Sequence, residues 1–81
     1  MAIAFVFITT EPASMPEVLK EVKAVRGVEE ADMVYGIYDI VAKVKAETVE
    51  SLKETVTKHI RRIDKVQKTI TMMVVKSEYL K

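Results

Sequence analysis

The sequence predicts an α+β fold in which two helices cover one face of a four-stranded antiparallel sheet. Two observations support this: four stretches read as strands, either as apolar runs or as alternating apolar residues, and apolar residues recur at helical spacing along two others. A third is their order along the chain: strand, helix, strand, strand, helix, strand. Two strand–helix–strand halves joined by a central hairpin form the split arrangement of ferredoxin-like βαββαβ folds. We expect one domain over residues 1–81, because 81 residues leave no room for a second.

The first strand and helix are expected within residues 2–27. Residues 2–9 are apolar on both alternating faces, so this strand should be covered on both sides. Ser14 and Glu17 have the spacing of a capping box, and Pro16 between them is tolerated in a first helical turn. Gly27 fits the left-handed stop of the helix. The core-facing residues of this helix are Val18, Leu19, Val22 and Val25.

A hairpin is expected in the middle of the chain. Strands over residues 28–35 and 38–44 flank Gly36, which should supply the positive φ of a tight reversal. Asp39 lies just inside the second strand, where a carboxylate must find donors or stay at the end of the sheet. The second strand alternates cleanly, with Ile40, Ala42 and Val44 on one face and Val41, Lys43 and Lys45 on the other.

The second helix should begin at the cap Thr48 and end near Arg61 and Arg62, where cations suit the helix dipole. A last strand follows over residues 68–75, and the charged tail 76–81 is expected to fray or swap onto a neighbour. The helix presents Val49, Leu52, Val56, Ile60 and Ile63 to the core. In the last strand Thr69, Thr71, Met73 and Val75 alternate with Ile70, Met72 and Val74.

Composition favours an associating protein. Two helices cover only one face of the sheet, and burying a large apolar side chain contributes about 1.5–3 kcal/mol. The chain has no cysteine for disulfides and no evident metal cluster, so a small domain should gain stability from association. We therefore expect dimerisation through the sheet.

Charge and hydropathy exclude several classes of function. Thirteen Lys and Arg against twelve Asp and Glu give a net charge of +1, which is no electrostatic footprint for nucleic acid. The apolar opening is too short for a membrane span and lacks the basic start of a signal peptide. We expect a cytoplasmic protein that binds neither DNA nor a membrane.

Nothing in the sequence requires catalysis. His59 is the single histidine, Ser14 and Ser51 are explained by helix starts, and no Gly-rich phosphate loop or metal-ligand spacing occurs. We expect no catalytic residue, metal or cofactor. One enzymatic alternative stays open, a small dimeric αβ-barrel that would use His59 or a tyrosine.

Four residues have the chemistry of an amino-acid site. Asp39 offers a charge for an ammonium group, Thr69 and Thr71 offer hydroxyls for a carboxylate, and Met72 offers an adaptable apolar wall. The two segments need not meet within one subunit, but they can meet across a subunit interface. Methionine and valine in this set favour aliphatic or methionine-like ligands.

The stretch Val34-Tyr35-Gly36-Ile37-Tyr38-Asp39-Ile40, supported by Thr69-Ile70-Thr71-Met72, resembles the Lrp/AsnC transcription regulators. Over residues 3–75 the chain is similar to their effector-sensing module, the RAM domain. The resemblance implies dimers that form through the sheets, rings that are often octamers, and amino-acid effectors between dimers. It implies effector-binding roles for Gly36, Tyr38, Asp39, Thr69, Thr71 and Met72.

In one respect the chain departs from this family. Full-length members begin with a helix-turn-helix DNA-binding domain, whereas this sequence starts at the first sheet strand and has no spare basic helix. We therefore expect a module that binds an amino acid itself or co-assembles with full-length regulators. A ligand-free assembly partner and an ACT-type sensor are the alternatives, and the Gly-Ile-Tyr-Asp turn favours the RAM assignment.

Overall fold

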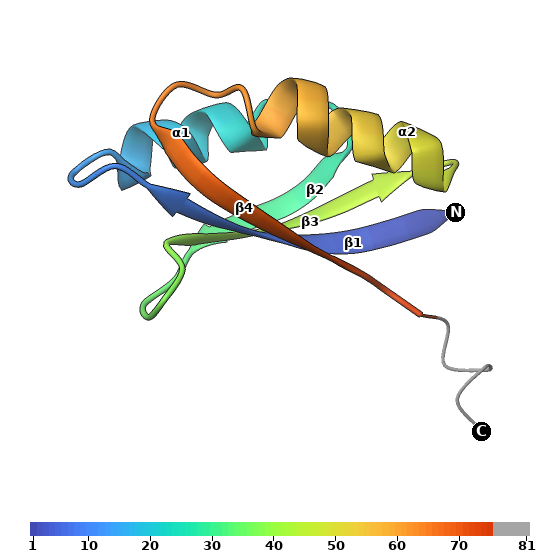
Figure 1. Cartoon of the computed structure of the whole chain (residues 1–81), viewed down its shortest axis with the longest axis horizontal. Coiled ribbons are helices and arrows are strands. Elements are labelled where there is room, and N and C mark those ends of the chain that lie inside the picture. Colours follow the sequence, from blue (N-terminus) through green and yellow to red (C-terminus); the bar gives the residue numbers. More distant parts are fainter. Residues whose placement is uncertain (76–81) are drawn as a thin grey trace.

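The four strands form one antiparallel sheet in the order β2-β3-β1-β4 in a computed structural model that describes residues 1–75. Both helices lie on the same face of this sheet (Figure 1). The predicted ferredoxin-like α+β fold is therefore confirmed. The elements are β1 (Ala2–Thr10), α1 (Met15–Lys23), β2 (Val28–Met33), β3 (Ile40–Ala46), α2 (Val49–Glu54), a π-helical turn η1 (Thr55–Ile60) and β4 (Val66–Met73).

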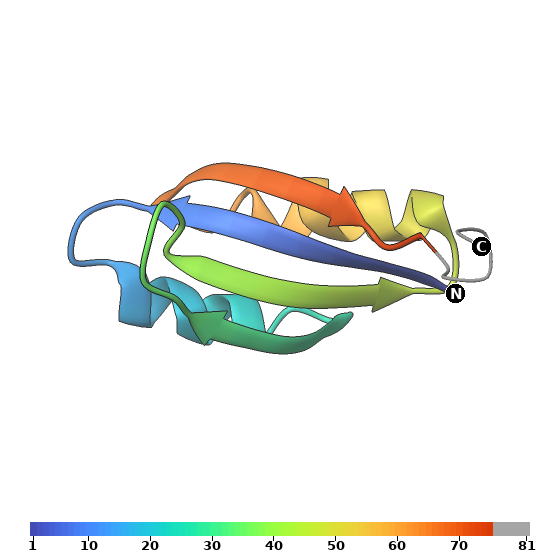
Figure 2. The ribbon, with the colours of Figure 1, turned by 90° about the horizontal axis from the view of Figure 1, so that it is seen from below.

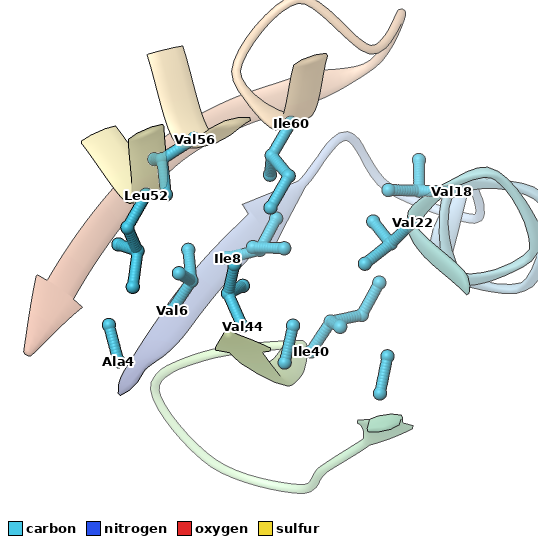
Figure 3. Close-up of a cluster of buried hydrophobic side chains, with 12 residues drawn as sticks. Ala4, Val6, Ile8, Val18, Val22, Ile40, Val44, Leu52, Val56 and Ile60 are labelled. Carbon is cyan, nitrogen blue, oxygen red and sulfur yellow. The ribbon is translucent and has the colours of Figure 1, made fainter. Parts of the chain in front are cut away.

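The core lies between the sheet and the helices. Strand β1 pairs with both β3 and β4, so that Val6 stands opposite Ala42 on one side and Thr71 on the other. Its alternate residues point under the helices and are fully buried, as the alternation predicted (Figure 3). The buried apolar residues are Ala4, Val6, Ile8, Val18, Val22, Ala31, Ile40, Ala42, Val44, Leu52, Val56 and Ile60.

The other face of the sheet carries no helix in the described part of the chain (Figure 2). Phe5 and Phe7 of β1 lie on it, and the pairing register places Met72 and Ile70 of β4 directly opposite them. Phe5 is 38% exposed. This open face therefore presents a continuous apolar surface along β1 and β4.

The two helix starts differ from each other in geometry. Thr48 has an extended backbone and its hydroxyl accepts a hydrogen bond from the Ser51 N–H at 3.0 Å, as predicted. The capping box predicted at Ser14 is wrong. Ser14 has a helical ψ of −1°, and its hydroxyl donates to the Pro12 carbonyl at 3.4 Å instead. Because a capping side chain needs an extended backbone, its oxygen does not reach the first-turn amides.

Helix α1 ends at Lys23, earlier than the glycine stop predicted at Gly27. Gly27 lies in the connection to β2 with a φ of +101°, and a Cβ there would approach the Lys45 carbonyl oxygen to 3.2 Å. The glycine therefore serves the close approach of this connection to β3.

Helix α2 widens into the π-helical turn η1, which the sequence reading missed. The buried residues Leu52, Val56 and Ile60 are four positions apart, a spacing that overshoots a turn of 3.6 residues. The wider turn takes up this excess, and the Arg61 N–H bonds to the Val56 carbonyl five residues back at 2.8 Å. All three side chains therefore face the sheet.

Strand bounds also differ from the prediction at the hairpin and at the end of the chain. Strand β2 ends at Met33 and β3 begins at Ile40, so a loop over residues 34–39 replaces the tight reversal. Strand β4 begins at Val66, and a bond from the Val74 N–H to the Ile3 carbonyl at 2.9 Å extends its pairing. The prediction for the tail 76–81 lies outside the described residues. No helix within residues 1–75 has the length and apolar character needed to cross a membrane.

Candidate functional site

Asp39 fixes the base of the hairpin loop to the end of β1. Its Oδ2 accepts hydrogen bonds from the backbone N–H of Thr10 at 2.8 Å and from the Thr10 hydroxyl at 3.2 Å. Its own N–H donates to the Ile8 carbonyl at 2.9 Å, and its carbonyl accepts from the Val34 N–H at 2.9 Å. The carboxylate therefore finds its donors within the chain. It orients the loop that begins at Val34.

The tip of this loop is exposed and apolar. Gly36 has a φ of +148°, as the sequence predicted, and nothing lies within 4 Å of the position that a Cβ would take. Tyr35 and Ile37 beside it are exposed, whereas Tyr38 packs edge-on against the ring of Phe7 with centroids 5.4 Å apart. In Figure 1 the loop extends on the side of the sheet away from the helices.

The candidate residues of β4 lie on two different faces. Thr69 and Thr71 stand opposite Ile8 and Val6, so they face the helices, whereas Met72 stands opposite Phe5 on the open face. Strand β1 separates all three from Asp39 and β3. Within one copy of the chain, the six predicted site residues therefore form two groups rather than one pocket.

A groove of about 330 Å³ lies between the second helix and β4. Thr69 and Thr71 form part of its wall, together with residues to which the sequence analysis gave no role in a site. Of these, Lys53, Thr57 and Arg61 are spaced four apart, and this spacing on a helix was the signal that could have found them. The full lining is Lys53, Val56, Thr57, Arg61, Thr69, Thr71 and Met73.

Ion pairs tie the elements together away from this groove. Lys65 Nζ lies 3.1 Å from Glu17 Oε1, and this hydrogen bond and the charge of Glu17 raise the pKa of Lys65 above its ordinary value of 10.5. Glu29 lies 3.9 Å from Lys43 and 3.6 Å from Lys45. These contacts link α1 to the start of β4 and β2 to β3.

Within residues 1–75, no three His, Cys, Asp or Glu side chains gather as a metal site. His59 is exposed on η1.

Comparison with known proteins assigns the family. The model of the Lrp/AsnC ligand binding domain matches residues 3–80. An uncharacterised HTH-type transcriptional regulator of Pyrococcus furiosus is 36% identical over 73 residues, which are 86% of this chain and 49% of that protein. The chain thus spans about half the length of this curated relative.

Two solved structures are similar to the whole described fold. A hypothetical protein from Pyrococcus horikoshii is 34% identical with a TM-score of 0.86, over 94% of this chain and 92% of that chain. AsnC of Escherichia coli is 28% identical with a TM-score of 0.86, over 93% of this chain and 51% of that chain. With its fold, its hairpin motif and its family match in agreement, the chain belongs to the Lrp/AsnC transcription regulators and matches their ligand-binding domain.

Proposed function

We propose that this chain is an oligomeric module that binds an amino acid and thereby alters the assembly of Lrp/AsnC-type regulators in the cytoplasm. It acts without catalysis and without binding DNA itself. The match to a ligand-binding domain and the likeness to regulators support the general class. The chemistry of the described residues supports an amino acid as the ligand, and the resemblance to the family implies the larger oligomer and a site between dimers.

The observation that carries the proposal is the uncovered apolar face of the sheet. Phe5, Phe7, Ile70 and Met72 are neighbours on this face. Large apolar surfaces on a small domain mark an interaction site. A second copy of the chain is the occupant that supplies an equally apolar sheet, which gives a symmetric dimer joined face to face.

The hairpin loop supports a site that spans subunits. It extends on the open side of the sheet, so its tip can reach a neighbouring copy (Figure 1). Gly36 and Tyr38 of one copy would then approach the edge strand β4 of another, which carries Met72 on the open face and Thr69 and Thr71 on the helix side. An ammonium group would meet Asp39 at Oδ1, the oxygen that does not take part in the two bonds from Thr10.

Binding at such a site is coupled to assembly. A ligand that bridges two dimers stabilises the larger oligomer by mass action and shifts the population toward it. Rings such as octamers, and mixed assemblies with full-length regulators, are the states through which the effector would act.

The first test is the molar mass by light scattering, with and without a mixture of the twenty amino acids. We expect a mass above that of a dimer that changes with the mixture. A dimer that is indifferent to every amino acid would contradict sensing and favour a ligand-free assembly partner.

A charge-only variant tests the role of Asp39. Asp39→Asn keeps an oxygen for the two bonds from Thr10 but removes the negative charge, so amino-acid affinity should fall while dimers persist. Asp32→Asn, on an exposed residue of β2, is the matched control. Titration calorimetry measures both variants, and unchanged affinity in Asp39→Asn would remove this residue from the site.

A further inference from the structure

We propose that the groove between η1 and β4 binds a carboxylate that carries an apolar chain, with Arg61 and Lys53 as its cationic partners. This assigns a binding role to two residues outside the predicted site. The groove runs along the side of β4 that faces the helices, away from the proposed dimer face.

The charged side chains that line the groove are all cationic. Its wall holds Lys53, Arg61 and three threonine hydroxyls but no acidic side chain. Four other hollows within residues 1–75 each have at least one carboxylate on their walls. An anion entering the groove therefore meets cations and donors without a repelling charge.

Both cations are available to a ligand. The ion pairs among the described residues involve Lys43, Lys45, Lys58 and Lys65, but neither Lys53 nor Arg61. Their positions follow from the helix geometry, since residues four apart lie on one side of a helix. The π-helical turn ends at Ile60, and the N–H of the next residue, Arg61, donates to the Val56 carbonyl at 2.8 Å.

The floor of the groove selects against a bare inorganic anion. Val56 is 6% exposed and Met73 is 39% exposed, and both line the same groove. A ligand with an aliphatic chain covers this apolar surface while its carboxylate meets the cations, and methionine side chains adapt to chains of different shape. The combination fits an aliphatic carboxylate better than phosphate.

The identity of the natural ligand rests on the proposed function. If the chain binds an amino acid, the carboxylate and side chain of that effector would occupy this groove, and its ammonium group would meet Asp39 of a neighbouring copy. The anion site itself is independent of that identification and is testable with simpler molecules.

The experiment is an NMR titration of the ¹⁵N-labelled chain with four probes: 4-methylpentanoate, 3-methylbutylamine, leucine and inorganic phosphate. The first two share one apolar chain and differ in the charged group. We expect 4-methylpentanoate to shift the amides of Thr57, Thr69 and Thr71, and the amine and phosphate to leave them in place. Equal responses to the carboxylate and the amine, or no response to the carboxylate, would overturn the proposal.

Variants separate binding from structure. Arg61→Gln should weaken 4-methylpentanoate by about tenfold, the effect of losing one charge-assisted hydrogen bond. Lys53→Gln should act in the same direction. Arg62→Gln removes a neighbouring cation that does not line the groove and should bind as wild type does. If Arg61→Gln also binds as wild type does, Arg61 serves only the helix end.

Leucine distinguishes this inference from the proposed function. If leucine and the mixture of the twenty amino acids both fail to bind while 4-methylpentanoate binds and depends on Arg61, amino-acid sensing fails and the anion site stands. If leucine binds with equal affinity to wild type and Arg61→Gln, sensing stands and the groove is not its site.

Discussion

Replacing Phe5 by serine should dissociate the proposed dimer without unfolding the chain. Phe5 lies on the open face of β1 and is 38% exposed. A buried aromatic side chain accounts for about 200 Å², so roughly 75 Å² per chain is left for a partner to cover. At about 25 cal/mol per Å² this is about 2 kcal/mol per chain and about 4 kcal/mol per symmetric dimer. The dimer dissociation constant should therefore rise by roughly a thousandfold.

Sedimentation equilibrium over a wide concentration range measures this change. Val49→Ser is the matched control, because Val49 is 42% exposed but lies on α2, behind the other face of the sheet. It should leave self-association unchanged. The reasoning is refuted if Phe5→Ser keeps its circular dichroism spectrum and still associates as tightly as wild type.

Four further substitutions test contacts within one copy. Asp39→Ala should lower the free energy of unfolding in urea by about 1–3 kcal/mol, because a buried N–H loses its acceptor; a smaller loss would mean that water replaces the carboxylate. Thr48→Ala should cost about 1 kcal/mol, whereas Ser14→Ala should cost less, because only the threonine hydroxyl caps its helix. Equal losses would contradict that contrast. Glu17 raises the pKa of Lys65 in the folded chain, so the stability from this pair is fully present below pH 10.5 and is lost as the pH rises through the raised pKa. The difference in unfolding free energy between wild type and Lys65→Gln should thus shrink above pH 10.5, and a constant difference would argue against the coupling.

The sheet could be predicted from the sequence because its two faces differ so regularly. The buried Ile40, Ala42 and Val44 alternate with more exposed neighbours. Because side chains alternate between the two faces, a register shift of one residue would move these three side chains out of the core. The ends of the strands could not be predicted in the same way. Tyr35 and Ile37 are as apolar as strand residues, yet they lie in a loop between β2 and β3. The hydrogen bond from the Val34 N–H to the Asp39 carbonyl joins the two ends of this loop.

The candidate site was only partly accessible to sequence reasoning. The residue types of an amino-acid site could be read, and the alternation along β4 already separates Thr69 and Thr71 from Met72. The groove lies beside the widened turn after Glu54, and the only local sign of that turn is the four-residue spacing of Leu52, Val56 and Ile60. Lys53 was therefore not singled out, and Arg61 was considered only as a cation at the helix end, although both line the groove.

Alternate positions of strand β1 affect two different properties, the stability of the single chain and the association proposed between chains. Val6 and its fully buried neighbours two positions away, Ala4 and Ile8, contact the helices, whereas Phe5 and Phe7 face away from them. A scan of single substitutions along this strand would therefore alternate in its readout from residue to residue. Substitutions at even positions would change the melting temperature of the single chain, and in the proposed dimer substitutions at odd positions would change the dissociation constant.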